Sequence, residues 1–118
     1  MSSATALKCA AILGASGVAL GAFGAHGLKN IISDPEKIRT WETASRYQMI
    51  HAAALLAYSA TGRHSRSVVG LWTAGAAMFS GSIYCLVLNK DVFRPLGPIT
   101  PLGGLFMIAG WLALLASP

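Results

Sequence analysis

Uncharged residues gather into four runs along this 118-residue chain. Lysine, arginine, aspartate and glutamate are absent from residues 9–28, 47–62, 67–89 and 95–118, runs of 20, 16, 23 and 24 residues. A helix rises about 1.5 Å per residue, so about 20 residues cross a hydrocarbon layer about 30 Å thick. Three runs are therefore long enough to span a membrane alone. The second becomes long enough together with the amphipathic stretch that begins at Trp41.

This pattern predicts an all-α membrane protein, with four transmembrane helices in one antiparallel bundle over residues 1–118. Ser33-Asp34-Pro35-Glu36 is a helix-start signature, with proline in the first turn and a glutamate placed to close a capping box. It predicts a short interfacial helix over 34–39, between the first two spans. The four spans are expected near residues 6–28, 42–62, 67–89 and 100–116.

Composition favours a membrane over water as the solvent of this surface. Hydrophobic residues make up 54% of the chain and charged residues 11%, against about 25% charged in soluble domains. A soluble bundle of this size would need a polar shell that the sequence lacks. A transmembrane β-barrel would need alternating apolar and polar positions, whereas these runs are continuously apolar.

The positive net charge is explained by loops that meet anionic lipid headgroups. The formal charge is +5, which in a soluble domain would suggest nucleic acid; in a membrane protein it suggests phospholipid, and we expect no nucleic-acid partner. Three basic residues flank the membrane on the side of the termini, and six flank it on the other: Lys8, Arg63 and Arg66, against Lys29, Lys37, Arg39, Arg46, Lys90 and Arg94. This bias predicts that the termini face the periplasm or the intermembrane space.

Glycines form the clearest pattern inside the runs. Gly14, Gly17, Gly21 and Gly24 recur at steps of three and four residues and predict a smooth helix face. Gly70 and Gly81, with Ala74 and Ala77 between them, predict a second such face. Small residues let two helices approach closely in lipid. The partner of the first face is either another helix of the chain, which we favour, or a foreign helix.

Two histidines are candidates for an intramembrane polar site. His26 and His51 are expected near the same membrane boundary, where their rings would lie close together. Ionisable groups within a membrane are often functional, in a proton relay or a metal or haem site. The alternative is a neutral histidine that hydrogen-bonds across a helix pair. Two histidines without further ligands make an incomplete zinc site, so neither a metal nor a cofactor is predicted.

Trp41, Arg46 and Tyr47 are candidate contacts to lipid headgroups. An indole suits the membrane boundary, and an arginine can extend its charged end towards it. Glu42 and Arg46 are also spaced for a helical ion pair.

Several motifs occur together in one order along the chain. They are Gly21-Ala22-Phe23-Gly24-Ala25-His26-Gly27, then Trp41, Ala44, Tyr47 and His51, then Phe79-Ser80-Gly81-Ser82-Ile83-Tyr84, and finally Gly97-Pro98-Ile99-Thr100-Pro101-Leu102-Gly103-Gly104 with Gly110-Trp111. In these the chain resembles the small four-helix membrane family of transmembrane protein 256 and the bacterial YgdD-like proteins. The resemblance covers about residues 14–115. It implies a bacterial inner membrane or a mitochondrial location and supplies no established active site.

Two functions from different classes fit these observations. The first is a non-catalytic accessory subunit of a larger membrane complex, most plausibly a respiratory-chain complex of the mitochondrial inner membrane, with membrane lipids and other subunits as partners. The second is an oligomeric transporter or channel, or a protein that binds quinone or lipid, with His26 and His51 at its site. An enzyme is not expected, because all four acidic residues lie in or beside loops.

The shortage of polar side chains predicts that the folded chain depends on an amphiphile. When detergent is diluted below its micelle concentration, the purified chain should aggregate, which light scattering would detect. A chain that stays folded and monodisperse in plain buffer would contradict the membrane interpretation.

Overall fold

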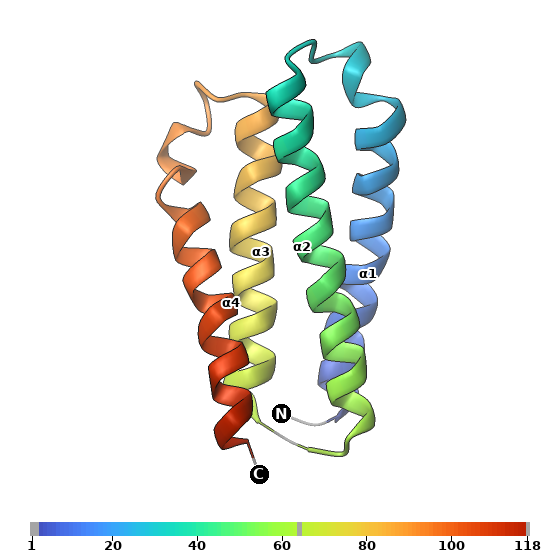
Figure 1. Ribbon diagram of the computed structural model, residues 1–118, viewed down its shortest axis with the longest axis vertical. Coiled ribbons are helices and arrows are strands. Elements are labelled where there is room, and N and C mark those ends of the chain that lie inside the picture. Colours follow the sequence, from blue (N-terminus) through green and yellow to red (C-terminus); the bar gives the residue numbers. More distant parts are fainter. Residues whose placement is uncertain (1–2, 64, 118) are drawn as a thin grey trace.

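The chain folds into four antiparallel helices, and the prediction of an all-α fold with four helices is confirmed. The computed structural model describes residues 3–63 and 65–117. The helices are α1 (Ser3–His26), α2 (Pro35–Ala60), α3 (Arg66–Leu88) and α4 (Ile99–Ala116). Two 3-10 turns lie in the longer connections, η1 (Leu28–Asn30) and η2 (Arg94–Leu96). Both longer connections lie at one end of the molecule, opposite the short α2–α3 turn (Figure 1).

The short interfacial helix predicted over 34–39 is not a separate element. Residues 35–39 are instead the first turns of α2, which begins seven residues earlier than expected for the second span. The Asp34 side chain accepts a hydrogen bond from the Glu36 amide at 3.0 Å, and Pro35 occupies the first turn. No helix-breaking residue follows before Trp41, so the helix that this cap starts continues without interruption.

Within the described residues, three helical segments are long and apolar enough to cross a membrane: Ser3–His26, Arg66–Leu88 and Arg94–Ala116. The segment α2 is not among them. It contains 26 residues, enough for about 39 Å of helix, but Arg46, Gln48 and His51 lower its hydropathy. The second predicted span therefore differs in kind from the other three, because protein buries its Gln48 and His51 while its Arg46 is exposed.

The glycine stripe of α1 packs against α2, within the chain. A Cβ built on Gly24 would lie 2.4 Å from Cδ1 of Trp41, and one built on Gly17 would lie 2.6 Å from Sδ of Met49. Gly14 and Gly21 are in looser contact with α2. The missing side chains leave room for the large side chains of α2, which is how small residues promote close packing in lipid.

The closest approach of α3 and α4 uses glycines that the sequence pattern did not single out. A Cβ on Gly103 would lie 2.4 Å from the Phe79 backbone nitrogen and 2.9 Å from the Gly75 carbonyl oxygen. Gly110 leaves room for the Trp72 indole in the same way. Gly70 and Gly81 form no close contact between helices of the described chain, because a Cβ on either would meet no atom within 4 Å; their packing against a foreign helix stays a prediction.

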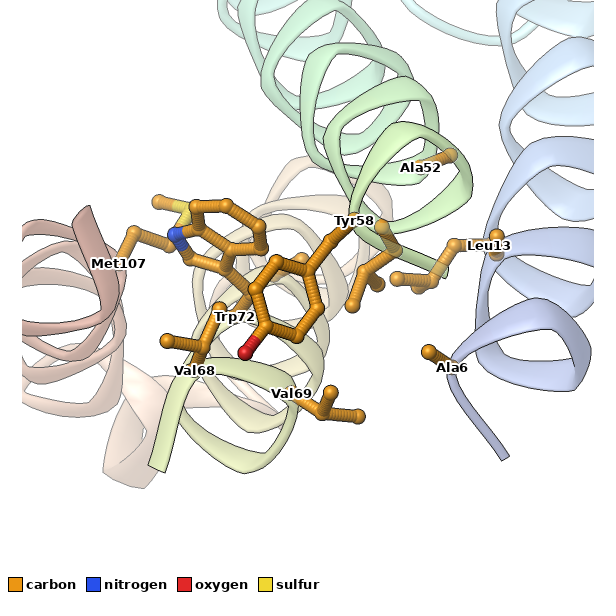
Figure 2. Packing of buried hydrophobic residues seen from close by; sticks show 11 residues of the cluster. Ala6, Leu13, Ala52, Tyr58, Val68, Val69, Trp72 and Met107 are labelled. Carbon is orange, nitrogen blue, oxygen red and sulfur yellow. The ribbon is translucent and has the colours of Figure 1, made fainter. Parts of the chain in front are cut away.

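Side chains from all four helices meet in one apolar core around Trp72 and Tyr58 (Figure 2). Ala6 and Leu13 enter it from α1, and Met107 enters it from α4. A second cluster lies nearer the long connections and contains Leu28, Trp41, Ala44, Ile83, Tyr84 and Val87. The helices α2 and α3 contribute to both clusters and form the centre of the molecule, with α1 packed on α2 and α4 packed on α3 (Figure 1).

Hydrogen bonds between helices pair most of the polar groups that α2 buries. The Gln48 amide donates to the Leu13 carbonyl oxygen at 3.0 Å and to Ser16 Oγ at 2.7 Å, and its Oε1 accepts from the Tyr84 hydroxyl at 2.8 Å. At the next turn the Ser80 hydroxyl donates to the Ala44 carbonyl oxygen at 2.6 Å. Among the described residues, the buried Trp72 indole N–H and Thr73 hydroxyl are without a hydrogen-bond partner.

The close contact of α3 and α4 predicts that Gly103→Ala destabilises the fold. The added methyl would meet backbone atoms, which can move only if the helices separate, and such overpacking typically costs about 1–3 kcal/mol. The matched control is Gly81→Ala, whose methyl has open space. It should be neutral or stabilising by up to about 1 kcal/mol, from helix propensity. Unfolding by sodium dodecyl sulfate in mixed micelles, followed by circular dichroism, measures both; equal stabilities would contradict the packing described.

Candidate functional site

His51 is a buried imidazole with both ring nitrogens paired. Its Nε2 lies 3.1 Å from the Trp111 Nε1, which can only donate, and its Nδ1 lies 2.7 Å from the Tyr47 carbonyl oxygen, which can only accept. These partners require a ring with the proton on Nδ1 and a bare Nε2, so His51 is neutral. The bond to Trp111 joins α2 to α4.

Aromatic rings surround this imidazole. The centroid of the His51 ring lies 6.2 Å from that of Trp72 and 5.9 Å from that of Trp111, in edge-on geometry. The two indoles are 4.6 Å apart. His51 itself is 3% exposed, whereas Trp111 is 44% exposed. The histidine is therefore held in place by protein groups, and the tryptophan forms the outer wall.

Two cavities lie one after the other along the outside of α2 and α4, between this aromatic cluster and the long connections. The lower cavity lies beside the aromatic cluster, farther from the long connections, and has a volume of about 450 Å³. It is lined by Thr43, Tyr47, His51, Phe79, Gly104, Met107, Ile108 and Trp111. On α2 the lining residues are three or four positions apart, so they form one stripe along the helix. The same spacing holds for Gly104, Ile108 and Trp111 on α4.

The same stripes continue into a second cavity at the end with the long connections. This upper cavity, about 520 Å³, is lined by Lys37, Thr40, Ile83, Leu86, Val87, Lys90, Arg94, Gly97 and Thr100. Thr40 lies one turn before Thr43 on α2, and Thr100 lies one turn before Gly104 on α4. We call the two cavities together the α2–α4 groove.

The upper cavity combines three cationic side chains with an apolar wall. None of the four acidic residues lines it. Arg94 forms a 3.5 Å ion pair with Asp91, in which both side chains are exposed; such a pair contributes little in water. Among the described residues, Lys37 and Lys90 form no ion pair. This end of the groove is therefore an electropositive opening above apolar surface.

The expected contact between His26 and His51 is absent. His26 is the exposed last residue of α1. His51 lies beside Ala52, which packs at the level of Gly14. Twelve residues separate Gly14 from His26, a distance of about 18 Å along a helix. His51 instead contacts Trp72 of α3 and Trp111 of α4, so the two-histidine site is not formed.

Trp41 is also placed differently from the prediction. Its indole is 1% exposed and donates a hydrogen bond to the Leu20 carbonyl oxygen at 2.8 Å, so it packs between helices and cannot reach a lipid headgroup. Arg46 is exposed, and the ion pairs of the described residues do not include the predicted pair with Glu42. Tyr47 is 43% exposed and packs its ring edge-on against Phe79 at 5.4 Å.

The sequence offered weak signals for the residues that it missed. Gln48 lies three positions before His51 in the same charge-free run, and Trp111 belongs to the Gly-Trp motif of α4. Lys37, Lys90 and Arg94 contributed to the charge count, but their common cavity depends on the folded arrangement. No cluster of three metal-ligating side chains is found in the described part of the chain.

Comparison with known proteins identifies the family. The sequence profile described as "Protein of unknown function (DUF423)" matches residues 20–104. A UPF0382 membrane protein of Schizosaccharomyces pombe is 40% identical over 94% of this chain and 98% of its own length. One from Staphylococcus aureus is 44% identical over 92% of this chain and 93% of its own length.

A third relative is the UPF0382 membrane protein YwdK of Bacillus subtilis, 41% identical over 85% of this chain and 84% of its own length. No solved structure matches the chain. All three relatives are named as membrane proteins. None of the three names contains the label transmembrane protein 256 or YgdD. The chain is therefore a small integral membrane protein, and it belongs to the DUF423 family of UPF0382 membrane proteins.

Proposed function

We propose that this protein is a non-catalytic accessory subunit that packs against other membrane proteins through the outer face of α1. The observation behind this proposal is a stripe of exposed small residues. While the glycines of α1 face α2, the exposed side carries a row of alanines beside the larger Leu7, Ile12, Val18 and Phe23: Ala4, Ala11, Ala15, Ala19 and Ala22. Ala11, Ala15 and Ala19 have the small-xxx-small spacing that lets a second helix approach closely.

The outer face of α4 makes a useful contrast. It exposes the large side chains Leu105, Ile108, Leu112 and Leu115, which suit fluid acyl chains. Small residues give lipid little to contact, whereas they let another helix backbone come near. The alanine row, which the exposed large side chains of α1 flank, supports a protein partner on α1, and the large side chains of α4 suit lipid.

The pairing of interior polar groups supports a non-catalytic role. Gln48, Ser80, Tyr84 and His51 each use their hydrogen-bonding groups on another part of this chain. General acid–base catalysis needs a titratable group that can reach a substrate. We do not propose the alternative, a transporter or quinone site built from His26 and His51, because the two residues lie about three turns apart.

For the assembly itself we propose a respiratory-chain complex. Relatives with the same membrane-protein name occur in bacteria and in a yeast, and respiratory complexes are a class of membrane assembly that both possess. This placement, in the mitochondrial inner membrane or the bacterial plasma membrane, also agrees with the resemblance to transmembrane protein 256.

We also propose that α2 crosses the membrane, which makes four spans in all. Polar residues are tolerated in a membrane when they face protein and are paired. Gln48 and His51 are 4% and 3% exposed and pair with groups on α1, α3 and α4. The basic residues of the long connections then favour termini on the periplasmic or intermembrane-space side.

Four spans predict opposite sides for Ser33 and Ser65. In a chain that carries Cys9→Ala and Cys85→Ala, Ser33→Cys and Ser65→Cys should react with an impermeant maleimide from opposite faces of sealed vesicles. Val92→Cys is the control and should react from the same face as Ser33→Cys. Labelling of Ser33→Cys and Ser65→Cys from one face, with Val92→Cys labelled from the other, would mean that α2 does not cross.

The alanine stripe predicts which substitution releases the protein from its assembly. Ala15→Leu with Ala19→Leu should shift the tagged chain from a large particle to a small one on a native gel after mild solubilisation, because leucines would hold the partner helix away. The control Ala77→Leu changes an exposed alanine of α3 and should leave migration unchanged.

Two results test the accessory role and the respiratory-chain assignment separately. A wild-type chain that migrates as a small free particle would contradict the accessory role. A large particle that lacks respiratory activity and cytochrome absorbance would contradict only the respiratory-chain assignment.

A further inference from the structure

The α2–α4 groove has the shape and charge of a site for one amphipathic anion. Its upper cavity carries Lys37, Lys90 and Arg94 without a lining carboxylate, and its lower cavity is walled by Tyr47, Phe79, Met107, Ile108 and Trp111. Cations at one end and apolar surface along the rest match a molecule with a negative head and a hydrocarbon tail. The groove therefore shows charge complementarity to a definite class of ligand.

The position of the cations matches the level of phospholipid headgroups. Lys90 and Arg94 follow the end of α3 and precede α4, and Lys37 lies in the first turn of α2. The ends of membrane-crossing helices lie near the headgroup layer, where basic residues attract anionic lipid. From Thr100 to Trp111 the groove follows 11 residues of α4, about 16 Å, which is about the depth of one leaflet.

The lower wall suits an acyl chain better than a polar ring such as a quinone. The hydroxyls of Thr40 and Thr43 donate to carbonyl oxygens of α2 itself, at 2.9 and 3.1 Å. The Thr100 hydroxyl is paired with that of Ser82, and both nitrogens of His51 are occupied. A quinone oxygen that used any of these groups would have to displace its bond, which leaves the exposed Tyr47 hydroxyl as its one donor in the lower wall among the described residues, whereas a hydrocarbon chain needs none of them.

We propose that this groove binds one anionic phospholipid. The phosphate lies among Lys37, Lys90 and Arg94, and one acyl chain follows Tyr47 and Phe79 down to Trp111. The site is independent of the accessory role, because it lies between α2 and α4, and the alanine stripe lies on α1. Binding would fill the space between the two outer stripes and cover the exposed face of Trp111.

Charge-removing variants test the headgroup. The chain is purified in non-ionic detergent, and native mass spectrometry counts bound phosphatidylglycerol and phosphatidylcholine with identical acyl chains. Wild-type chain should retain one phosphatidylglycerol in preference to phosphatidylcholine. Lys37→Gln with Lys90→Gln should weaken phosphatidylglycerol binding roughly tenfold or more, since each basic residue near the headgroup contributes about fivefold.

The matched control removes the same charge at the same end of the molecule. Lys29→Gln with Arg39→Gln changes two exposed cations that do not line the groove, and it should keep the preference within about twofold. Equal loss in both double variants would mean unspecific attraction and would overturn the proposal. The proposal would also be overturned if the wild-type chain bound both lipids equally, or if only the control variant lost binding.

A substitution in the wall tests the acyl chain without changing charge. A Cβ on Gly104 would lie 3.8 Å from Phe79 Cδ1, an ordinary contact, so Gly104→Leu should fold and fill the lower cavity. It should lower phosphatidylglycerol retention at least about fivefold, with an unchanged far-ultraviolet spectrum. Unchanged retention in this variant would overturn the proposed path of the chain.

A photoactivatable lipid gives the position directly in the wild-type protein. Phosphatidylglycerol with a diazirine in mid-chain should label residues 43–51 of α2 and 104–111 of α4. Labelling spread evenly over the exposed faces of α1 and α4 would show ordinary surrounding lipid and would overturn the proposal.

Discussion

The structure depends on how α2 satisfies its polar groups away from water. An unpaired amide or hydroxyl is costly in hydrocarbon, and α2 carries Gln48 and His51 in its middle. Gln48 reaches both α1 and α3, and His51 reaches α4. These bonds are short only if the neighbouring helices come close, and the α1 glycines permit that approach. The polar residues of α2 can therefore be paired only because the glycines of α1 let the two helices pack closely.

The number of helices was predictable because it follows from local sequence. A charge-free run of about 20 residues between charged connections leaves few alternatives to an apolar helix, and the helix ends lie within three residues of the prediction for α1, α3 and α4. The start of α2 was missed because the capping signature at Asp34 was assigned to a separate short helix. Nothing between Glu36 and Trp41 could have ended it.

The faces of the helices were harder to predict than their number. Gly70 and Gly81 have the same spacing signal as the glycines of α1, yet a Cβ on either would meet no atom within 4 Å, whereas Gly75 and Gly103 allow backbone contact. Spacing identifies a smooth face and does not say which direction it points. The groove could not be predicted from the sequence for the same reason. Lys37 and Lys90 line one cavity only because α2 and α3 run antiparallel.

The distribution of backbone contacts has a consequence for how the molecule assembles in a bilayer. Glycines bring α1 against α2 and α4 against α3, so the chain consists of two tightly packed hairpins, each formed from neighbours in sequence. The seam between them relies on larger side chains and on bonds such as Ser80 to Ala44. With α2 as the proposed fourth span, each hairpin could enter the bilayer as a unit, and the first would leave Gln48 without its Tyr84 partner until the second arrives. Insertion and final docking would then be separate events, and the bonds of Tyr84 to Gln48, Ser80 to Ala44 and Trp111 to His51 would form only on docking.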